Sequence, residues 1–211
     1  MSDETHEDIT SAQFGIMMHQ ALERIAQWVN ESGVKEDKLD SIINEIIHEH
    51  MAYSTEKTIV QKRMQHLCQL IGQSNLIQKN QKGLSTAKTE YSLSIPIEDD
   101  FFCVIYDMLI ENENGELEVW DWKTNACSNQ DQVDILAKRY ALQMRYYAYL
   151  LYLLKPDQWS YTTRLLFTGM IAQSAEESVW TRTIQIDMVE IPLIYDEIKS
   201  HIEKAKQSVI L

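Results

Sequence analysis

Apolar residues in the first third of the chain recur every three or four positions, which is the spacing of one face of an α-helix. Residues 11–31 carry such a stripe, with Ser11 as a predicted N-cap and Gly33 as the predicted end. Residues 36–52 and 56–73 repeat the pattern, and the polar segment 74–85 is typical of a loop. The three stripes consist of Phe14, Met18, Ala21, Ile25 and Trp28; Leu39, Ile42, Ile43, Ile46 and Ile47; and Ile59, Met64, Leu67, Leu70 and Ile71.

From residue 89 the apolar period becomes two, which indicates strands. In TEYSLSIPI, residues 89–97, apolar and polar positions alternate, so we expect a half-buried strand with Pro96 at its end or on a sheet edge. The continuous apolar run FFCVIYDMLIE, residues 101–111, predicts a central strand. ENENGE then supplies a tight turn, and LEVWDWKT, residues 117–124, is the predicted hairpin partner.

The remainder of the chain alternates between the two periods. We predict a long helix over 132–154, strands over 160–169 and 177–186, and a last helix over 189–208. This order predicts an α/β (α+β) fold with a central mixed β-sheet flanked by helices and an N-terminal helical segment. With 211 residues and 45% apolar content, we expect one domain over 11–211, preceded by an acidic disordered leader, residues 1–10.

Composition excludes several classes of protein. No uncharged apolar run reaches the roughly 18 residues that a membrane span requires, so we expect no membrane association. The first residues, MSDETHED, lack the basic-then-apolar pattern of a secretory signal. Cys68, Cys103 and Cys127 are far apart and form no CxxC pair, which argues against zinc and iron–sulfur sites and favours a reduced, cytoplasmic compartment.

The formal net charge of −13 argues against a broad nucleic-acid surface, because phosphate binding normally uses clustered lysine and arginine. Part of this excess is local, since MSDETHED contains four acids and no lysine or arginine. Acids that bind a metal ion would in addition be neutralised by that ion.

The segment EVWDWKTN, residues 118–125, carries the candidate chemistry. On a strand, Asp121 and Lys123 point to the same face while Trp122 points to the other. The facing strand 101–111 has one interior charge, Asp107. Charges near a core are costly unless they are paired or bound to a metal. The group is therefore either a salt bridge at a strand end or a site where a divalent cation balances the second acid.

Asp107 followed by Asp121-x-Lys123 resembles the PD-(D/E)xK nuclease signature. GIMMHQALE, residues 15–23, looks like the GxxxHxxLE helix that opens RecB- and AddA-type nuclease domains. YALQMRYY, residues 140–147, is similar to their YxxQxxxY helix.

Glu90 resembles the acid that precedes the first core strand of those domains, and all these blocks occur in the expected order. Two features depart from the family pattern. Tyr106 replaces the proline of the signature, and the usual glycine near the motif acid is missing.

The resemblance implies a restriction-endonuclease-like core and a metal-dependent DNA nuclease. His19, Asp107, Asp121 and the backbone carbonyl of Trp122 would bind the metal, and Lys123 would orient the attacking water and stabilise developing negative charge. Mg²⁺ is the expected cofactor, and the histidine ligand suggests that Mn²⁺ is also accepted. The remaining site residues, expected to support the site or contact DNA, are Glu90, Gln143 and Tyr147.

Each of these residues also has a structural interpretation. His19 could be an ordinary histidine at the edge of a helix stripe, with Glu23 four residues later as a hydrogen-bond partner. Glu90 could be a solvated strand residue, and Tyr147 belongs to an apolar core stripe. Gln143 is harder to explain in this way, because a polar residue beside that stripe needs a partner.

The resemblance implies an exonuclease-like enzyme that hydrolyses phosphodiester bonds in single-stranded DNA or at duplex ends during DNA end processing or repair. The resemblance implies a helicase domain or subunit as partner, although the chain itself contains no GxxxxGK[ST] motif. Two alternatives stay open: a catalytically silent nuclease-fold scaffold in a helicase–nuclease complex, and an unrelated binding protein with a chance Asp-x-Lys.

Overall fold

The computed structural model of the chain describes residues 11–32, 36–51, 56–73, 86–97, 100–112, 114–171 and 176–209. The chain divides into two compact units. We call Met1–Gly83, Trp122–Gln130 and Phe167–Trp180 the helical unit, and Leu84–Asp121, Asp131–Leu166 and Thr181–Leu211 the sheet unit. The predicted leader 1–10, the predicted helix end at Gly33 and the predicted loop 74–85 lie outside the described residues. No helix in the described part of the chain is both long and apolar enough to cross a bilayer.

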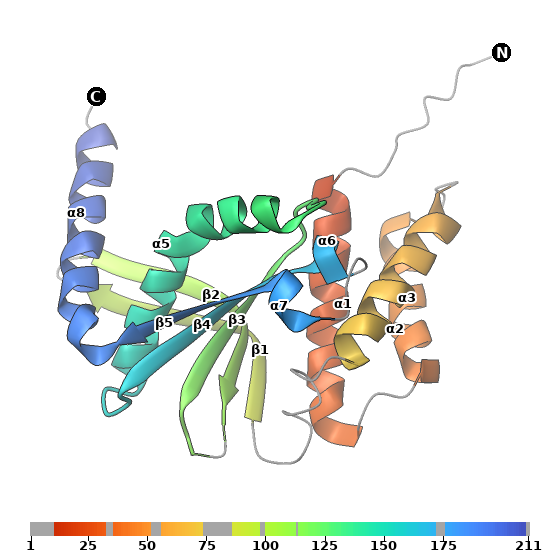
Figure 1. Cartoon of the computed structure of the whole chain (residues 1–211), viewed down its shortest axis with the longest axis horizontal. Helices are drawn as coiled ribbons and strands as arrows, with labels where there is room; N and C mark the ends of the chain where they lie inside the picture. Colours follow the sequence, from red (N-terminus) through yellow and green to blue (C-terminus); the bar gives the residue numbers. More distant parts are fainter. Residues whose placement is uncertain are drawn as a thin grey trace. The chain divides into compact units, whose positions relative to one another are not determined.

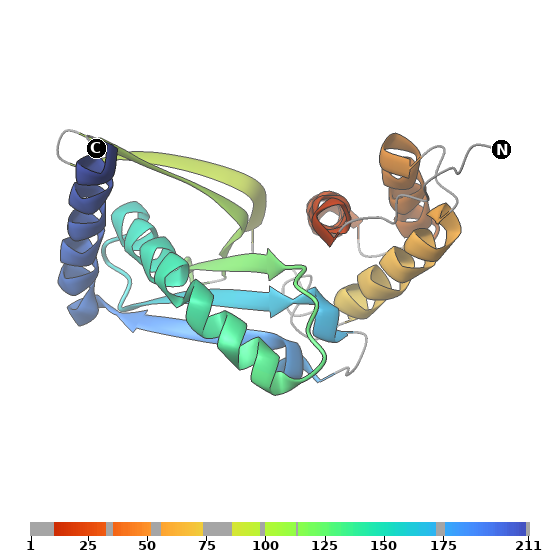
Figure 2. The same ribbon diagram turned by 90° about the horizontal axis from the view of Figure 1, so that it is seen from above.

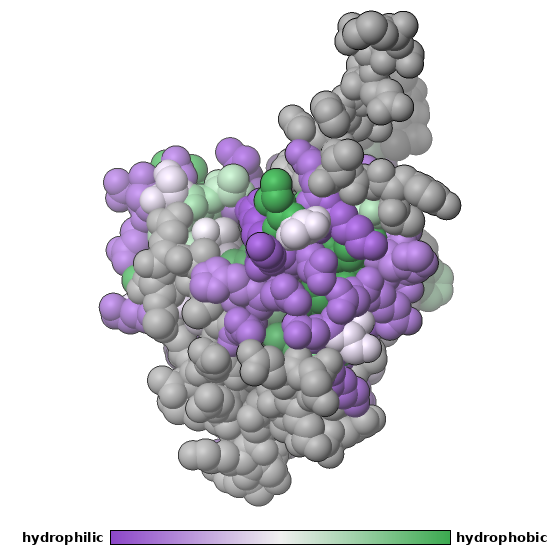
Figure 3. Space-filling view, turned by 90° about the vertical axis from the view of Figure 1, so that its right-hand side faces the viewer, coloured by the Kyte–Doolittle hydropathy of each residue, from purple (hydrophilic) through white to green (hydrophobic). Residues whose placement is uncertain are grey.

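The helical unit contains the three predicted helices, α1 (Ser11–Ser32), α2 (Glu36–Met51) and α3 (Lys57–Gln73), together with the short helices α6 (Thr168–Ile171) and α7 (Glu177–Trp180) (Figure 1). The apolar stripes of α1 and α2 are buried as predicted, apart from Trp28, whose side chain lies outside the described set. Most of the coloured residues in Figure 3 are hydrophilic. This agrees with amphipathic helices, which turn their polar faces to the solvent.

One stripe position of α3 was predicted wrongly. Ile59 is 71% exposed, and the buried face of this helix consists instead of Val60, Met64, Leu67 and Cys68. The periodicity of α3 was therefore identified correctly, but its first buried turn begins one residue later than predicted. The side chains of Leu70 and Ile71 lie outside the described residues.

The sheet has five strands in the order β1-β2-β3-β4-β5. Neighbouring strands are antiparallel for β1/β2, β2/β3 and β4/β5, whereas the arrows of β3 and β4 point in the same direction (Figure 2). The predicted mixed sheet is therefore confirmed. The strands are β1 (Thr86–Ile97), β2 (Asp100–Glu111), β3 (Leu117–Lys123), β4 (Ser160–Phe167) and β5 (Thr181–Asp187).

Helix α5 (Gln130–Leu154) connects β3 to β4, and the 3-10 turn η1 (Met188–Glu190) leads into α8 (Ile191–Val209). Aromatic contacts attach α5 to the sheet on one side and to α8 on the other. The ring of Tyr147 meets the ring of Tyr106 on β2 edge-on at 5.0 Å, and Tyr149 stacks on Tyr195 of α8 at 5.8 Å. The sheet is thus flanked by helices, as predicted.

The ends of β4 and β5 differ from the predicted strands 160–169 and 177–186. Strand β4 stops at Phe167, and residues 168–171 form α6. Residues 177–180 form α7, and pairing with β4 begins only at Thr181, opposite Leu166.

The prediction that 101–111 is a central strand holds for only about a third of β2. Strand β3 pairs with β2 only from Met108 to Glu111, so within the described residues the rest of β2 pairs with β1 alone. Phe101 and Ile105 are consequently 75% and 53% exposed. The apolar run continues beyond the part of the sheet that buries it.

Candidate metal centre

Three adjacent strands of the sheet unit each present an acid at the same level of the sheet. Glu90 lies between the pairs Thr89↔Met108 and Tyr91↔Tyr106, which places it opposite Asp107. On the other side of β2, Met108 pairs with Trp120. The next position in the same register sets Asp107 of β2 opposite Asp121 of β3. Opposite residues of antiparallel strands project from the same face. By this register the acids of β1, β2 and β3 are aligned across the sheet, although Asp121 does not belong to the group of mutually close ligand atoms that contains Glu90 and Asp107.

Glu90 has an unusual backbone for a strand residue. Its φ is +47°, in the left-handed region that side-chain-bearing residues rarely adopt, and residues held there cost on the order of 1–3 kcal/mol. The neighbouring residues on both sides remain paired with β2. Strain of this kind clusters at functional positions, so it singles out Glu90 within an otherwise regular strand.

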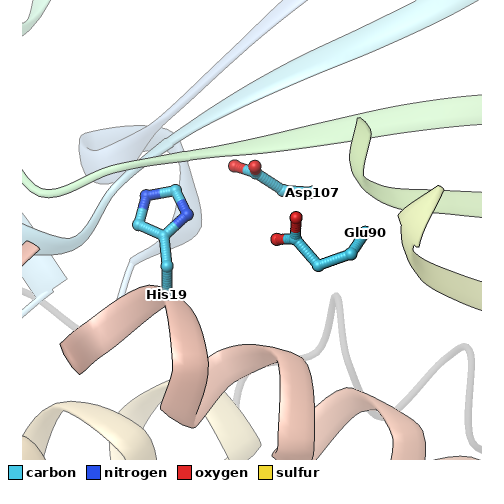
Figure 4. Close-up of side chains that lie close together, drawn as sticks. All are labelled: His19, Glu90 and Asp107. Carbon is cyan, nitrogen blue, oxygen red and sulfur yellow. The ribbon is translucent and has the colours of Figure 1, made fainter. Parts of the chain in front are cut away.

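The carboxylates of Glu90 and Asp107 lie next to each other. One oxygen of each is within 4.8 Å of the other (Figure 4). Two ionised carboxylates at that distance repel by about 1 kcal/mol in a water-like medium and about 3 kcal/mol at an effective dielectric constant of ~20. Glu90 is exposed and Asp107 is half-buried. A cation between them would reverse this repulsion, and carboxylate oxygens are the donors that Mg²⁺ and Mn²⁺ prefer.

Asp121 is 3% exposed and is held by helix α5. The hydroxyl of Tyr147 and the amide nitrogen of Gln143 each donate a hydrogen bond to Asp121 Oδ1 across 3.4 Å. Gln143 also donates to the Tyr147 hydroxyl at 2.6 Å, and that hydroxyl lies 3.3 Å from the carbonyl oxygen of Ile105. Gln143 and Tyr147 are one helical turn apart, which is why both reach the same carboxylate.

The pKa of Tyr147 is raised, first by burial and then by the negative charge of Asp121. The phenol therefore keeps its proton and acts as a hydrogen-bond donor at neutral pH. The interpretation of Tyr147 as a simple core residue is incomplete, because its ring packs in the core while its hydroxyl contacts the acid. The partner that Gln143 was expected to need consists of Asp121 and the Tyr147 hydroxyl.

Trp122 and Lys123 continue β3 into the helical unit. Trp122 is 4% exposed and Lys123 is half-buried. The Thr168 hydroxyl donates a hydrogen bond to the carbonyl oxygen of Lys123 at 3.4 Å, at the start of α6. Because β3 is a regular strand through Lys123, the side chains of Asp121 and Lys123 leave it on one face, as the sequence predicted.

His19 is half-buried on α1, one helical turn after Gly15. A Cβ atom on Gly15 would come within 2.8 Å of Thr124 Oγ1, so glycine is what lets α1 approach the residue that follows Lys123. Within the helical unit, the helix that carries His19 therefore packs against the chain at the end of β3. Sequence reasoning noted the glycine in the motif but missed this packing role.

His19, Glu90 and Asp107, drawn as sticks in Figure 4, can each offer a ligand atom to a metal ion: a ring nitrogen from the histidine and a carboxylate oxygen from each acid. From the sequence, Glu90 was expected to support the site or contact DNA, not to bind the metal. The overlooked signal is the register, because a hairpin that pairs Tyr91 with Tyr106 must also set Glu90 opposite Asp107.

Comparison with known proteins agrees with this arrangement at the level of the family. A model of the PD-(D/E)XK nuclease superfamily, whose members generally hydrolyse phosphodiester bonds, matches residues 2–208. No curated protein matches the chain. The family match covers nearly all of the sequence and includes all of the acids described above. The chain belongs to the PD-(D/E)XK nuclease superfamily.

Proposed function

We propose that this protein is a RecB/AddA-like, metal-dependent DNA nuclease that hydrolyses phosphodiester bonds in DNA end processing or repair. The observation that carries the proposal is the row of three acids, Glu90, Asp107 and Asp121, on adjacent strands of a chain from this superfamily. Without a cation, neighbouring carboxylates repel one another. A divalent ion bound between them makes the electrostatic energy of the same geometry favourable.

In this proposal Asp107, Asp121, His19 and the backbone carbonyl of Trp122 hold the ion, and Glu90 adds its carboxylate beside Asp107. These are mainly oxygen donors with one imidazole, a set that suits Mg²⁺ and also accepts Mn²⁺. When bound, such an ion lowers the pKa of a water molecule and screens the negative charge of a phosphodiester.

The chain's own residues have separate tasks. Gln143 and Tyr147 fix the orientation of Asp121 through the hydrogen bonds to its Oδ1 atom. Lys123, two residues along the same strand face, supplies a positive charge where negative charge develops on the phosphate. Burial of Asp121 keeps bulk water away from one side of the carboxylate, which strengthens its electrostatic interactions.

The proposed substrate is single-stranded DNA or the end of a duplex. A formal net charge of −13 disfavours binding along long duplex tracts, which normally relies on clustered lysine and arginine. We therefore propose that a helicase domain or subunit delivers the DNA to the site. Tight DNA binding by the isolated chain at physiological salt would contradict that part of the proposal.

The test is cleavage of end-labelled single- and double-stranded DNA by the purified chain with Mg²⁺, Mn²⁺ or EDTA. We expect cleavage that requires the metal and falls by at least about a hundredfold in Asp121→Ala and Lys123→Ala. Asp157→Ala, which removes an exposed acid from the β4 side of the sheet unit, is the matched control and should retain activity.

Two results would contradict the proposal. Absence of cleavage by the folded wild-type chain would favour the silent scaffold. Cleavage that is equal in the wild type, Asp121→Ala and Lys123→Ala would assign the activity to a contaminant or to another site.

A further inference from the structure

Four large apolar side chains are exposed where β4 begins and where β5 leads into α8. Trp159 is 73% exposed, and Met188, Val189 and Leu193 are 36%, 75% and 65% exposed. We call these four residues the Trp159 patch. All belong to the sheet unit, and none takes part in the proposed metal site.

The patch is continuous through the backbone. Ser160 pairs with Asp187 as the last step of the β4–β5 ladder, and one residue further on the Met188 amide donates to the carbonyl oxygen of Trp159 at 3.1 Å. Val189 and Leu193 are one turn apart along η1 and the first turn of α8. The two chain segments thus bring their apolar residues to one end of the sheet unit.

The segments that carry these exposed residues are held in place by hydrogen bonds and by buried neighbours. Gln158, 6% exposed, accepts a hydrogen bond from the Leu117 amide at 2.7 Å and donates to the carbonyl oxygen of Ser160 at 2.6 Å. In the first turns of α8, Ile191 and Ile194 are buried, so Leu193 lies on the opposite side of the helix. The fold therefore presents the patch outward on rigid elements.

Acidic residues surround the patch. Asp157, Asp187 and Asp196 are all exposed. In the described segments 155–163 and 186–198, the only lysine or arginine is Lys155, which is half-buried with its ammonium hydrogen-bonded to the carbonyl oxygen of Gly115. The bases that directly follow these segments are engaged elsewhere, Arg164 with Glu118 and Lys199 over the ring of Tyr195, so acids predominate at the rim of the patch.

We propose that the Trp159 patch docks a basic segment of another protein chain that inserts large apolar side chains beside Trp159. Exposed apolar patches rimmed by polar residues mark interaction sites, and tryptophan is enriched among the residues that dominate binding energy. The acidic rim favours an occupant with a positive charge. Nucleic acid and anionic lipid would be repelled by it, and a second copy of this chain would bring the same acids against one another.

The test is selection from a random peptide library on the full-length chain, with counter-selection on Trp159→Ser. We expect the recovered peptides to combine lysine or arginine with large apolar residues. The best peptide, labelled for fluorescence anisotropy, should lose at least about tenfold in affinity on Trp159→Ser. It should also bind Asp157→Asn/Asp187→Asn more weakly and with less dependence on salt.

Ile135→Ser is the matched control, because Ile135 is a 59% exposed apolar residue of the same unit on α5. It should leave peptide affinity unchanged, and thermal melting should establish that every variant is folded. The proposal is overturned if no peptide prefers the wild type to Trp159→Ser, or if the selected peptides are neutral or acidic.

Two further results would assign the patch to another occupant and also overturn the proposal. One is concentration-dependent dimerisation in analytical ultracentrifugation that Trp159→Ser abolishes. The other is co-sedimentation with vesicles of three parts phosphatidylcholine to one part phosphatidylglycerol that the same substitution abolishes. Neither depends on nuclease activity, so the metal site and the docking surface are tested separately.

Discussion

The hydroxyl of Tyr147, on α5, donates a hydrogen bond to Asp121 Oδ1, on β3, across 3.4 Å. The acid of the nuclease signature and the tyrosine of the YxxQxxxY segment are thereby joined in one unit of the fold. The same tyrosine ring meets Tyr106 of β2 at 5.0 Å. A single side chain of α5 thus contacts both strands that carry the central acids, so α5 is the element that fixes the orientation of Asp121.

Removing the Tyr147 hydroxyl should weaken the site without disrupting the core. In Tyr147→Phe the ring packing remains and a hydrogen bond worth about 1 kcal/mol is lost. Loss of an outer partner of a metal ligand typically costs tenfold or more in metal affinity or activity. We therefore expect about a tenfold fall in DNA cleavage that higher Mg²⁺ partly restores, measured as cleavage rate against metal concentration.

Tyr146→Phe provides the control for this prediction. The Tyr146 hydroxyl is hydrogen-bonded to His201 Nδ1 at 2.8 Å, on the side of α5 that faces α8. Its removal should leave the metal dependence of cleavage unchanged. If Tyr146→Phe and Tyr147→Phe shift that dependence equally, the Tyr147 hydroxyl has no special connection with Asp121.

The left-handed backbone at Glu90 predicts an inverted order of stability for two small substitutions. Both Glu90→Gly and Glu90→Ala remove the carboxylate, but only glycine adopts a φ of this sign without steric cost. We expect Glu90→Gly to be more stable than Glu90→Ala by about 1 kcal/mol in urea unfolding, and both to lose metal binding.

Ser92, two residues further along the same strand, provides the comparison. It lies in regular pairing opposite Ile105, so glycine there should be less stable than alanine. If alanine is also the more stable residue at position 90, the strained conformation of Glu90 does not exist in solution.

Alkaline pH should destabilise the sheet unit through its buried tyrosines. The pKa of Tyr147 is raised by burial and by Asp121, and that of Tyr106 by burial and by the neighbouring Tyr147 and Tyr91. The unfolded chain releases these protons near pH 10, before the folded chain does. The stabilisation is therefore complete below pH 10 and is lost as pH rises above it.

This effect can be measured as the free energy of unfolding between pH 8 and pH 11. We expect a decline above about pH 10 that is shallower in Tyr147→Phe than in the wild type. Parallel curves for the two proteins would mean that Tyr147 ionises equally easily in the folded and unfolded chains.

Much of the fold could be predicted because its signals are local. The stripe of α2 is a helical repeat that needs no knowledge of its neighbours, and all five of its residues are buried. The alternation in β1 likewise matches its half-buried and exposed positions from Tyr91 to Pro96. The acid of β2 and the Asp-x-Lys of β3 could be grouped because a tight turn fixes which strands are adjacent.

The features that could not be predicted depend on distant neighbours. Residues 177–180 were predicted as the start of a strand, yet they form a helix, and pairing of β5 with β4 begins only at Thr181. Phe101 belongs to an apolar run but lies beyond the stretch of β2 that β3 covers. The backbone of Glu90 departs from the extended conformation, which no propensity of glutamate predicts.

The most direct test of the account is Mn²⁺ binding by the purified chain, followed by isothermal calorimetry in the absence of DNA. Asp107→Asn keeps the size of the central acid and removes its charge, while Asp157→Asn does the same at an exposed position between α5 and β4. The account predicts that Asp107→Asn lowers the affinity for Mn²⁺ at least about tenfold and that Asp157→Asn leaves it unchanged. Identical isotherms for the wild type and Asp107→Asn would contradict the assignment of the acidic row as a metal site.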